Sequence, residues 1–202
     1  MADNGKKLDP RILRTRKLIE SSFLELLEEE DFQSITIQDI TDRATINRST
    51  FYAHFDDKYM LFDHIIRQTF MQSIKSKVPL SAEFSMKNLR SLIIAVCDYL
   101  TRLNWQYHPT DLQLKPVIET QVQSQLYKIL LNWIKPLETD FENLNPSSEL
   151  TASMLSWSIY GIGLQCSQLG ELTSVEEVAD QALDLLSGAL FSSPSIESLE
   201  VA

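Results

Sequence analysis

Between Arg11 and Val78 the chain contains neither glycine nor proline, and this absence is what most constrains its fold. These two residue types are the strongest breakers of helices and the usual residues of tight hairpin turns. A stretch of this length without them favours helices joined by short turns over a sheet. Apolar residues also recur at helical intervals in the rest of the chain. The sequence therefore predicts an all-α protein.

The first helix is predicted to start at Asp9, since an aspartate can cap a helix and Pro10 suits the first helical position. It is expected to end near Glu30 and Asp31. The spacing of its apolar residues predicts one buried face, made of Ile12, Ile19, Phe23 and Leu26 or Leu27.

Two short helices are predicted to follow. Thr36 and Asp39 have the spacing of a capping box, which marks the start of the second helix. Asn47 can cap the third helix. Phe51 and Phe55 lie four residues apart in this region, so both are expected to face inward.

A fourth helix is expected to run from Asp56 or Asp57 towards Pro79. Further along, apolar periodicity predicts about five more helices, near residues 86–104, 112–122, 123–134, 150–169 and 174–190. Breaks between them are expected at Pro109, Pro116, Pro136, Pro146 and Gly170. The total is about nine helices, followed by a flexible tail over residues 193–202.

The second and third helices, with residues 45–47 between them, form a predicted helix-turn-helix. Such a motif holds its second helix out from the domain, where it can enter the major groove of DNA. From Ala44 to Phe55 the only formal charge is Arg48. A carboxylate there would repel phosphate, so the absence of acids favours a DNA-binding role. A polar face that merely contacts solvent is the alternative.

The net charge of the chain is −10, which is the wrong sign for binding nucleic acid through bulk electrostatics. Local charge differs, because residues 1–19 carry six basic side chains against two acids, Asp3 and Asp9. Cations near a helix N-terminus oppose the helix dipole, so helix stability does not explain them. An external polyanion would explain them, and a solubilising tail is the alternative. The six are Lys6, Lys7, Arg11, Arg14, Arg16 and Lys17.

Residues 37–58 resemble the DNA-binding signature of the TetR/AcrR family of transcriptional regulators. The specific part is the run Thr50-Phe51-Tyr52-Ala53-His54-Phe55 followed by Lys58. The resemblance covers about the first 65 residues. One departure is Thr45, because the family usually has glycine at this position of the turn.

By position, the resemblance implies that Arg48 and Ser49 read bases. Phosphate contacts are implied for Thr36, Thr50, Tyr52, His54 and Lys58. The physical chemistry agrees, because polar and cationic groups position a protein on the DNA backbone while arginine can bond guanine through two hydrogen bonds. For Tyr52, a place in the core beside Phe51 is the alternative. The complete predicted DNA-binding set is Thr36, Asn47, Arg48, Ser49, Thr50, Tyr52, His54 and Lys58.

For the rest of the chain the resemblance implies a helical domain that binds an effector and forms a homodimer through its last two long helices, near residues 150–169 and 174–190. Small residues interleaved with large apolar ones in those helices suit close helix packing, and packing within one chain is the alternative. An effector pocket, if present, is expected to be lined by aromatic residues that could equally be core: Trp105, Tyr107, Trp133 and Tyr160.

Enzymatic, metal-binding and membrane classes are disfavoured. The three histidines and two cysteines lack metal-ligand spacing, and Gly161 and Gly163 lack the third glycine of a dinucleotide-binding fingerprint. We therefore expect no metal, no cofactor and no enzyme activity. Cys97 and Cys166 are expected to be free, buried thiols without a chemical role. The start of the chain lacks the apolar run of a signal peptide, and no stretch is long enough to span a membrane, so a cytoplasmic protein is expected.

The sequence thus predicts a helix-turn-helix DNA-binding domain over residues 1–57 and a helical effector-binding and dimerisation domain over residues 58–192. The expected function is that of a dimeric transcriptional regulator of double-stranded DNA, most often a repressor in this family, released from its operator by a small-molecule effector. The alternative is a helical module that binds a small molecule or a protein and does not bind DNA. An enzyme with an unfamiliar active site is a third possibility.

Overall fold

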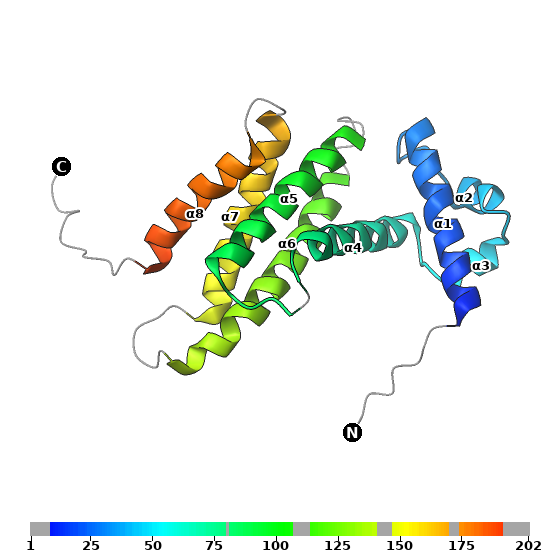
Figure 1. The fold of residues 1–202 in the computed structure, drawn as a ribbon. Coiled ribbons are helices and arrows are strands. Elements are labelled where there is room, and N and C mark those ends of the chain that lie inside the picture. The colour runs from blue at the N-terminus through cyan, green and yellow to red at the C-terminus, as the bar shows by residue number, and fades with distance from the viewer. Residues whose placement is uncertain (1–8, 80, 107–113, 141–146, 170–173, 192–202) are drawn as a thin grey trace, which may run out of the picture. The chain divides into compact units, whose positions relative to one another are not determined.

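The computed structural model describes residues 9–79, 81–106, 114–140, 147–169 and 174–191, which are coloured in Figure 1. These residues form eight α-helices and one 3₁₀ helix, and none of them lies in a strand. The predicted all-α class is therefore confirmed. None of the described helices is long and apolar enough to cross a membrane.

The chain divides into two compact units. Unit 1 comprises Met1–Phe70 and Leu103–Val122, and unit 2 comprises Met71–Arg102 and Gln123–Ala202. We describe each unit by itself.

Unit 1 contains three complete helices, α1 (Pro10–Glu29), α2 (Ile37–Arg43) and α3 (Arg48–Tyr52). It also contains the first part of α4 (Lys58–Lys77), the last four residues of α5 (Met86–Gln106) and the first nine of α6 (Leu114–Ile134). Helix α1 contacts α2, and α2 contacts α3 (Figure 1). Three fully buried aromatic rings, Phe23, Phe32 and Phe62, form the centre of the core, with ring centroids 5.9 to 6.3 Å apart. Edge-on and tilted contacts of this kind stabilise an apolar core beyond the burial of their area. The rings therefore fix α1, α4 and the segment before α2 against one another.

The start and end of α1 follow the sequence prediction. Asp9 caps the helix, because its Oδ1 accepts a hydrogen bond of 2.9 Å from the backbone N–H of Arg11. The helix ends at Glu29. One predicted core position is wrong: the side chain of Ile12 is 40% exposed, because burial along α1 begins only at Ile19. The first turns of α1 thus lie outside the core.

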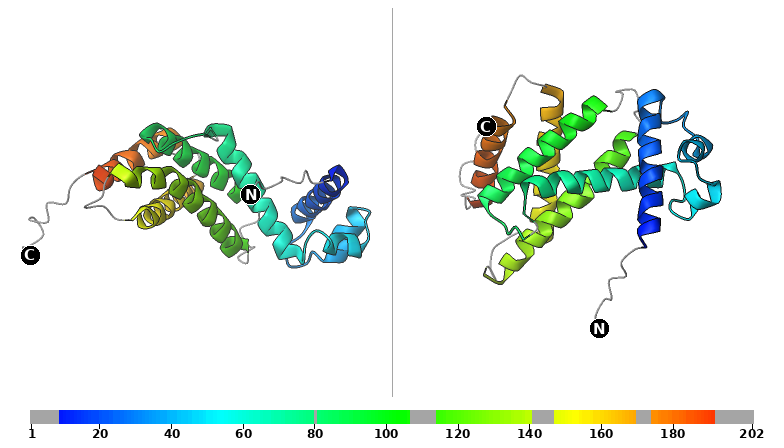
Figure 2. Two further views of the ribbon diagram at one scale, coloured as in Figure 1. Left: turned by 90° about the horizontal axis from the view of Figure 1, so that it is seen from below. Right: turned by 45° about the vertical axis from the view of Figure 1, so that its right-hand side comes forward.

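Unit 2 contains helices α7 (Ser148–Leu169) and α8 (Val175–Phe191), most of α5 (Met86–Gln106) and α6 (Leu114–Ile134), and the 3₁₀ helix η1 (Lys135–Asp140). Helices α5, α7 and α8 lie side by side, as the views in Figures 1 and 2 agree. Their buried residues are mostly apolar and include Leu92, Val96, Ala152, Ile159 and Ala179.

About nine helices were expected, and the described residues form eight α-helices. Helix α6 runs without a break through the two helices predicted over residues 112–122 and 123–134. Pro116 does not break the helix because it is the third residue of α6. The first four N–H groups of a helix have no partner within the helix, so a proline among them removes no hydrogen bond. The expected breaks at Pro109, Pro146 and Gly170 lie outside the described residues.

Candidate nucleic-acid interface

Helix α2 begins at a capping box, as predicted. The hydroxyl of Thr36 accepts a hydrogen bond of 3.2 Å from the N–H of Asp39, and the Asp39 carboxylate accepts one of 2.8 Å from the N–H of Thr36. The hydroxyl of Thr36 also donates to that carboxylate. These bonds lower the pKa of Asp39 below its usual value, so the cap carries its full charge at neutral pH. Thr36 is exposed, and its capping bonds hold the start of α2 in place.

The turn between α2 and α3 passes through Thr45, which has a φ of 54°. This is the left-handed region, where a residue with a branched Cβ is strained and glycine is not. The backbone around it is closed by hydrogen bonds from Ala44 N–H to the Ile40 carbonyl, 2.9 Å, and from Ile46 N–H to the Thr41 carbonyl, 3.0 Å. These local bonds at the end of α2 hold this threonine in the conformation that glycine adopts readily.

Helix α3 is held by aromatic residues. Phe51 is fully buried, Phe55 is 6% exposed, and their ring centroids lie 6.0 Å apart. Asn47 is the N-cap residue, as predicted, but its side chain makes no capping hydrogen bond. Only the backbone carbonyl of Asn47 does so, accepting from the N–H groups of Thr50 and Phe51 at 2.9 and 3.2 Å. The Asn47 side chain is exposed.

The other face of α3 is open. Arg48 and Ser49 are exposed, Thr50 is half-buried, and Tyr52 is 52% exposed. Tyr52 contacts the buried Phe51 ring edge-on, with centroids 5.7 Å apart. Among the residues that the structure describes, none forms an ion pair with Arg48. We call the set Asn47, Arg48, Ser49, Thr50, Tyr52 and His54 the recognition face.

His54 lies at the C-terminal edge of the recognition face and is half-buried. Burial lowers the pKa of its imidazole, and the positive charge of Arg16 lowers it further. The ring is therefore neutral at pH 7. His64, in α4, also has a lowered pKa, mainly through burial, although the Glu20 carboxylate 3.1 Å from its Nε2 opposes the shift.

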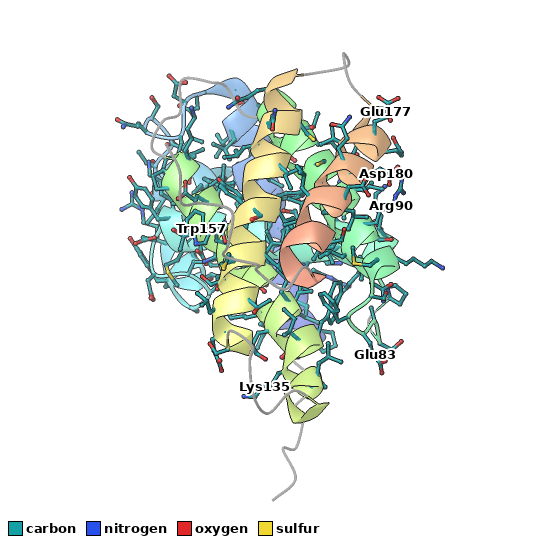
Figure 3. The ribbon with its side chains drawn as sticks, turned by 90° about the vertical axis from the view of Figure 1, so that its left-hand side faces the viewer. Glu83, Arg90, Lys135, Trp157, Glu177 and Asp180 are labelled. Carbon is teal, nitrogen blue, oxygen red and sulfur yellow. The ribbon has the colours of Figure 1, made fainter. Side chains whose placement is uncertain are left out.

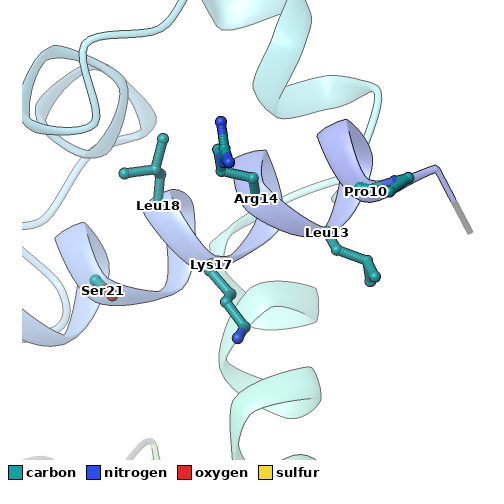
Figure 4. A pocket seen from close by; sticks show the side chains of 6 residues that line it. All are labelled: Pro10, Leu13, Arg14, Lys17, Leu18 and Ser21. Carbon is teal, nitrogen blue, oxygen red and sulfur yellow. The ribbon is translucent and has the colours of Figure 1, made fainter.

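Arg16 brings the basic start of α1 to the end of α3. Its guanidinium lies over the Phe55 ring, 5.4 Å from the centroid. Arg11, Arg14 and Lys17 are exposed on the same helix. In Figure 4, Arg14 and Lys17 line a surface hollow of α1 together with Pro10, Leu13, Leu18 and Ser21. The predicted local positive charge thus sits in the same compact unit as the recognition face, while Lys6 and Lys7 lie outside the described residues.

The acidic end of α1 is tied to α2. The guanidinium of Arg43 donates two hydrogen bonds of 2.6 Å to the two carboxylate oxygens of Glu29. This pair raises the pKa of Arg43 and lowers that of Glu29, so both stay charged across the physiological range. One of the acids at this end of the helix is thereby neutralised.

Lys58 has a role that sequence reasoning missed. Its Nζ donates to the backbone carbonyls of Phe32, Gln33 and Ile35 at 2.7, 3.0 and 2.7 Å, and it lies 4.6 Å from the centroid of the Phe32 ring. An ammonium group has three donors, and all three are used here. A phosphate contact by Lys58 would have to replace at least one of these bonds. No local sequence pattern predicts that Lys58 binds these three carbonyls, because they lie 23 to 26 residues earlier in the chain.

The predicted effector residues lie in several parts of the structure. Trp133 on α6 and Tyr160 on α7 are buried, at 8% and 6% exposure. Tyr107 and the side chain of Trp105 lie outside the described residues. Among the described residues, no group of three or more histidine, cysteine or acidic side chains could hold a metal ion.

Large apolar side chains are exposed on α7 and α8, the two helices predicted to form the dimer. They include Met154, Trp157 and Leu185, at 61%, 55% and 77% exposure. Figure 3 labels Trp157 on α7. On α8, the Asp180 carboxylate instead accepts two hydrogen bonds from Arg90 of α5, at 2.5 and 2.9 Å, so this side of α8 is fastened to its own chain. We call the exposed residues of α7 and α8 the apolar face: Leu150, Met154, Trp157, Leu164 and Leu185.

Comparison with known proteins agrees with the helix-turn-helix. Residues 23–65 match the tetR family of bacterial regulatory proteins. The chain is 33% identical over 104 residues to the uncharacterized HTH-type transcriptional regulator YxbF of Bacillus subtilis (strain 168), a match that covers 50% of this chain and 27% of YxbF. It is 22% identical over 113 residues to the HTH-type transcriptional repressor DhaR of Mycobacterium sp. (strain GP1), covering 54% of this chain and 57% of DhaR. The matched part thus spans about a quarter of the first relative and just over half of the second.

Most of the chain has the same fold as solved structures of bacterial regulators. A TetR-family regulator from Streptomyces coelicolor A3 superposes with a TM-score of 0.60 at 15% identity, covering 90% of this chain and 97% of that one. The tetR family consists of regulators rather than enzymes, in agreement with the sequence prediction. Residues 23–65 thus carry the helix-turn-helix of the tetR family of bacterial regulatory proteins, and the chain as a whole shares its fold with a TetR-family regulator.

Proposed function

We propose that the protein is a dimeric repressor that binds operator DNA through the recognition face and is released by a small-molecule effector. In this proposal residues 1–57 bind DNA and residues 58–192 bind the effector and form the dimer; the predicted tail, 193–202, lies outside the described residues. The observation that carries it is the recognition face itself, which is exposed at Asn47, Arg48, Ser49 and Tyr52, free of carboxylates and backed by buried phenylalanines.

The residues of this face have complementary chemistry. Arg48 can donate two parallel hydrogen bonds to a guanine edge, and the hydroxyl of Ser49 can bond a base of either kind. Thr36, Thr50, Tyr52 and His54 carry donors suited to phosphate oxygens, and Asn47 extends the polar surface at the start of α3. The exposure of Tyr52 favours this role over a place in the core. Lys58 would contribute a phosphate contact only by giving up a bond to the loop before α2.

DNA binding can be tested on the purified full chain with genomic fragments selected for binding. We expect affinity to fall steeply with added salt, because each phosphate contact releases counterions. Arg48→Ala should mainly relax base preference, with a loss of about 1–3 kcal/mol on the preferred site. Tyr52→Ala should weaken binding similarly on all sequences. The matched control is Lys87→Ala, which removes an exposed cation from α5 of unit 2.

Binding that does not depend on salt, or no selected fragment at all, would contradict a DNA-binding role. The latter outcome would favour the alternative of a helical module that binds a small molecule or a protein.

A homodimer is proposed through the apolar face. Trp157 and Leu185 expose apolar surface that a second copy can bury, and Gly161 between Trp157 and Leu164 has no atom within 4 Å of where a Cβ would lie. Two helices from each of two copies make a four-helix bundle, which suits a two-fold dimer. A dimer is what two recognition helices need to read paired half-sites.

Sedimentation equilibrium tests the dimer. Trp157→Glu should convert the protein to a monomer, since it would bury a charge at the centre of the interface. The control is Leu137→Glu, which makes the same kind of change at an exposed apolar residue of η1 outside the apolar face. A Trp157→Glu protein that stays dimeric would contradict this interface.

For the effector, the buried aromatic residues of unit 2 are the proposed lining, with Trp133 and Tyr160 among the described residues. An effector releases DNA only by binding the two conformations of a regulator with different affinities, a coupling typically worth about 1–3 kcal/mol. We expect quenching of tryptophan fluorescence on effector binding, and loss of that signal in Trp133→Phe.

A further inference from the structure

Cys97 on α5 and Cys166 on α7 lie in contact inside unit 2. The thiol of Cys166 donates a hydrogen bond to the sulfur of Cys97, with 2.9 Å between the two Sγ atoms. Both are free thiols and both are buried, at 0% and 6% exposure. They are the only two cysteines of the chain. The sequence predicts two free, buried thiols without a chemical role, and because 69 positions separate them no local pattern indicates that they meet.

A close crossing of α5 and α7 explains why the two sulfurs meet. Gly163 lies almost one turn before Cys166, and a Cβ at this glycine would lie 2.8 Å from Val96 Cγ1 and 2.8 Å from Leu100 Cδ1. Those two residues flank Cys97 on α5. Only a residue without a side chain permits this approach, so the backbones come together beside the two thiols.

The distance between the sulfurs decides which chemistry fits. Two thiolates bound to one zinc ion at about 2.3 Å in tetrahedral geometry would lie roughly 3.8 Å apart. A disulfide needs about 2.05 Å, so a modest approach of the two Sγ atoms is enough. Among the described residues there is no further cluster of ligands that would complete a metal site here. The pair is therefore arranged for a covalent bond between its two sulfurs.

We propose that Cys97 and Cys166 form a reversible intrachain disulfide that links α5 to α7 when the protein meets a small, uncharged peroxide. The proposal goes beyond the DNA-binding function and does not depend on it. In the first step the sulfur of Cys166 attacks the O–O bond of hydrogen peroxide, giving a sulfenic acid and one water. In the second step the sulfur of Cys97 attacks the sulfenic sulfur, and the hydroxyl leaves with the Cys97 proton as a second water. Two thiols lose two electrons, and the peroxide is reduced to two waters.

The burial of the two thiols determines which oxidant can reach them and which thiol reacts first. Cys166 is the slightly more exposed thiol, so it is the one that a small molecule reaches first. Burial raises the pKa of the Cys97 thiol, and its contact with Cys166 raises it further. Cys97 thus keeps its proton until the sulfenic acid forms beside it. A charged oxidant such as glutathione disulfide would have to shed its hydration to enter, so it should react far more slowly than peroxide.

The disulfide would change the protein in two measurable ways. It would close a loop between positions 69 residues apart, which restricts the unfolded chain and should raise the Tm by about 5 to 15 °C. It would also fix α7 against α5 within unit 2. Since α7 carries most of the apolar face, the oxidation state would bear directly on the helix proposed to form the dimer.

The experiment uses the full chain, reduced, desalted and then treated with hydrogen peroxide at the concentration that oxidises Cys166 in Cys97→Ser. After denaturation, free thiols are labelled with a maleimide reagent and the intact mass is measured. We expect two labelled thiols before peroxide and none after it, a mass lower by about 2 Da before labelling, and recovery of both thiols with dithiothreitol. Glutathione disulfide should give little change over the same time.

The single variants are the controls. Cys97→Ser should gain oxygen, Cys166→Ser should gain oxygen or stay unchanged, and neither should lose two hydrogens. The proposal is overturned if the wild-type protein keeps both thiols under this treatment, if both are oxidised separately to sulfinic acids, or if peroxide links two chains on a non-reducing gel. It is likewise overturned if Cys166 cannot be oxidised in Cys97→Ser at any peroxide concentration that leaves the protein folded.

Discussion

Each of the two units of the protein is stabilised by a different kind of contact. In unit 1 the recognition face is backed by the buried Phe51 and Phe55, and polar bonds fix the segments around it, namely the capping box at Thr36 and the ammonium of Lys58. In unit 2 the decisive contact is apolar, where α5 and α7 cross at Gly163. Polar bonds lose most of their net value to competition with water, while close packing depends on shape. A substitution in unit 1 should therefore destabilise the protein by leaving a polar group without its partner. A substitution at the helix crossing of unit 2 should do so by a steric clash.

The largest effect is expected at Lys58. Lys58→Met keeps much of the aliphatic length but leaves three carbonyls of the loop before α2 without their donor, so it should lower the free energy of unfolding by about 2–4 kcal/mol. Chemical denaturation followed by circular dichroism measures it. The control, Lys75→Met, alters an exposed lysine in the last turn of α4. An unchanged stability with weakened DNA binding would show that Lys58 acts on phosphate instead.

Next in size is the helix crossing of unit 2. Gly163→Ala should destabilise the protein by about 1–3 kcal/mol, because its Cβ would press on Val96 and Leu100. Gly161→Ala, two residues away on the same helix, has open space within its own chain and should be neutral or stabilising by up to about 1 kcal/mol when both variants are made in the Trp157→Glu protein, which the proposed dimer does not complicate. Thermal melts of the two variants give the comparison. Equal effects would mean that the crossing does not depend on close approach.

A stabilising change is expected in the turn of unit 1. Thr45→Gly should raise the free energy of unfolding by about 1 kcal/mol, since glycine adopts the positive φ of this position without strain. Ser21→Gly, on an exposed position of α1, should instead lower it by about 0.5–1 kcal/mol. A destabilised Thr45→Gly protein would show that the threonine side chain contributes more than its backbone costs.

The smallest effect is that of pH on DNA binding. The folded pKa of His54 is lowered by burial and by Arg16, so the free protein holds fewer protons than the unfolded chain, and stability decreases as the pH falls through 6.5. A nearby phosphate would favour the protonated ring, so affinity for DNA should rise roughly two- to fivefold between pH 7.5 and pH 6.0. Binding titrations at constant ionic strength measure this. The same pH dependence in His54→Gln would assign the effect elsewhere, with His64 the first group to examine.

Several features of the fold could be read from the chain. The helical class, the caps at Asp9 and Thr36 and the anchoring of α3 by Phe51 and Phe55 all depend on residues a few positions apart. Predictions were wrong where a rule based on neighbouring residues took no account of where in the helix or in the core the residue lies. Pro116 was expected to break a helix but lies in its first turn, and Ile12 has the right spacing for a buried face but lies before the core begins.

In the candidate site, too, the features set by neighbouring residues could be predicted and those set by long-range contacts could not. The resemblance and the acid-free run named the recognition face by position, but the bonds of Lys58 to carbonyls more than 20 residues away carry no local signature. The contact of Arg16 with Phe55 likewise joins α1 to the end of the helix-turn-helix across 39 positions, a distance in sequence that no periodicity spans.

By itself, the order of residues determined that the chain is helical, where its first helices begin, and which short helix presents a surface free of acids. These properties follow from dihedral preferences, capping groups and side-chain spacing within a turn or two. Only the tertiary structure decided that Lys58 closes a loop and that Cys97 meets Cys166. Each of these depends on packing between segments far apart in the chain, where the shape of the neighbour, and not the local sequence, sets the distance.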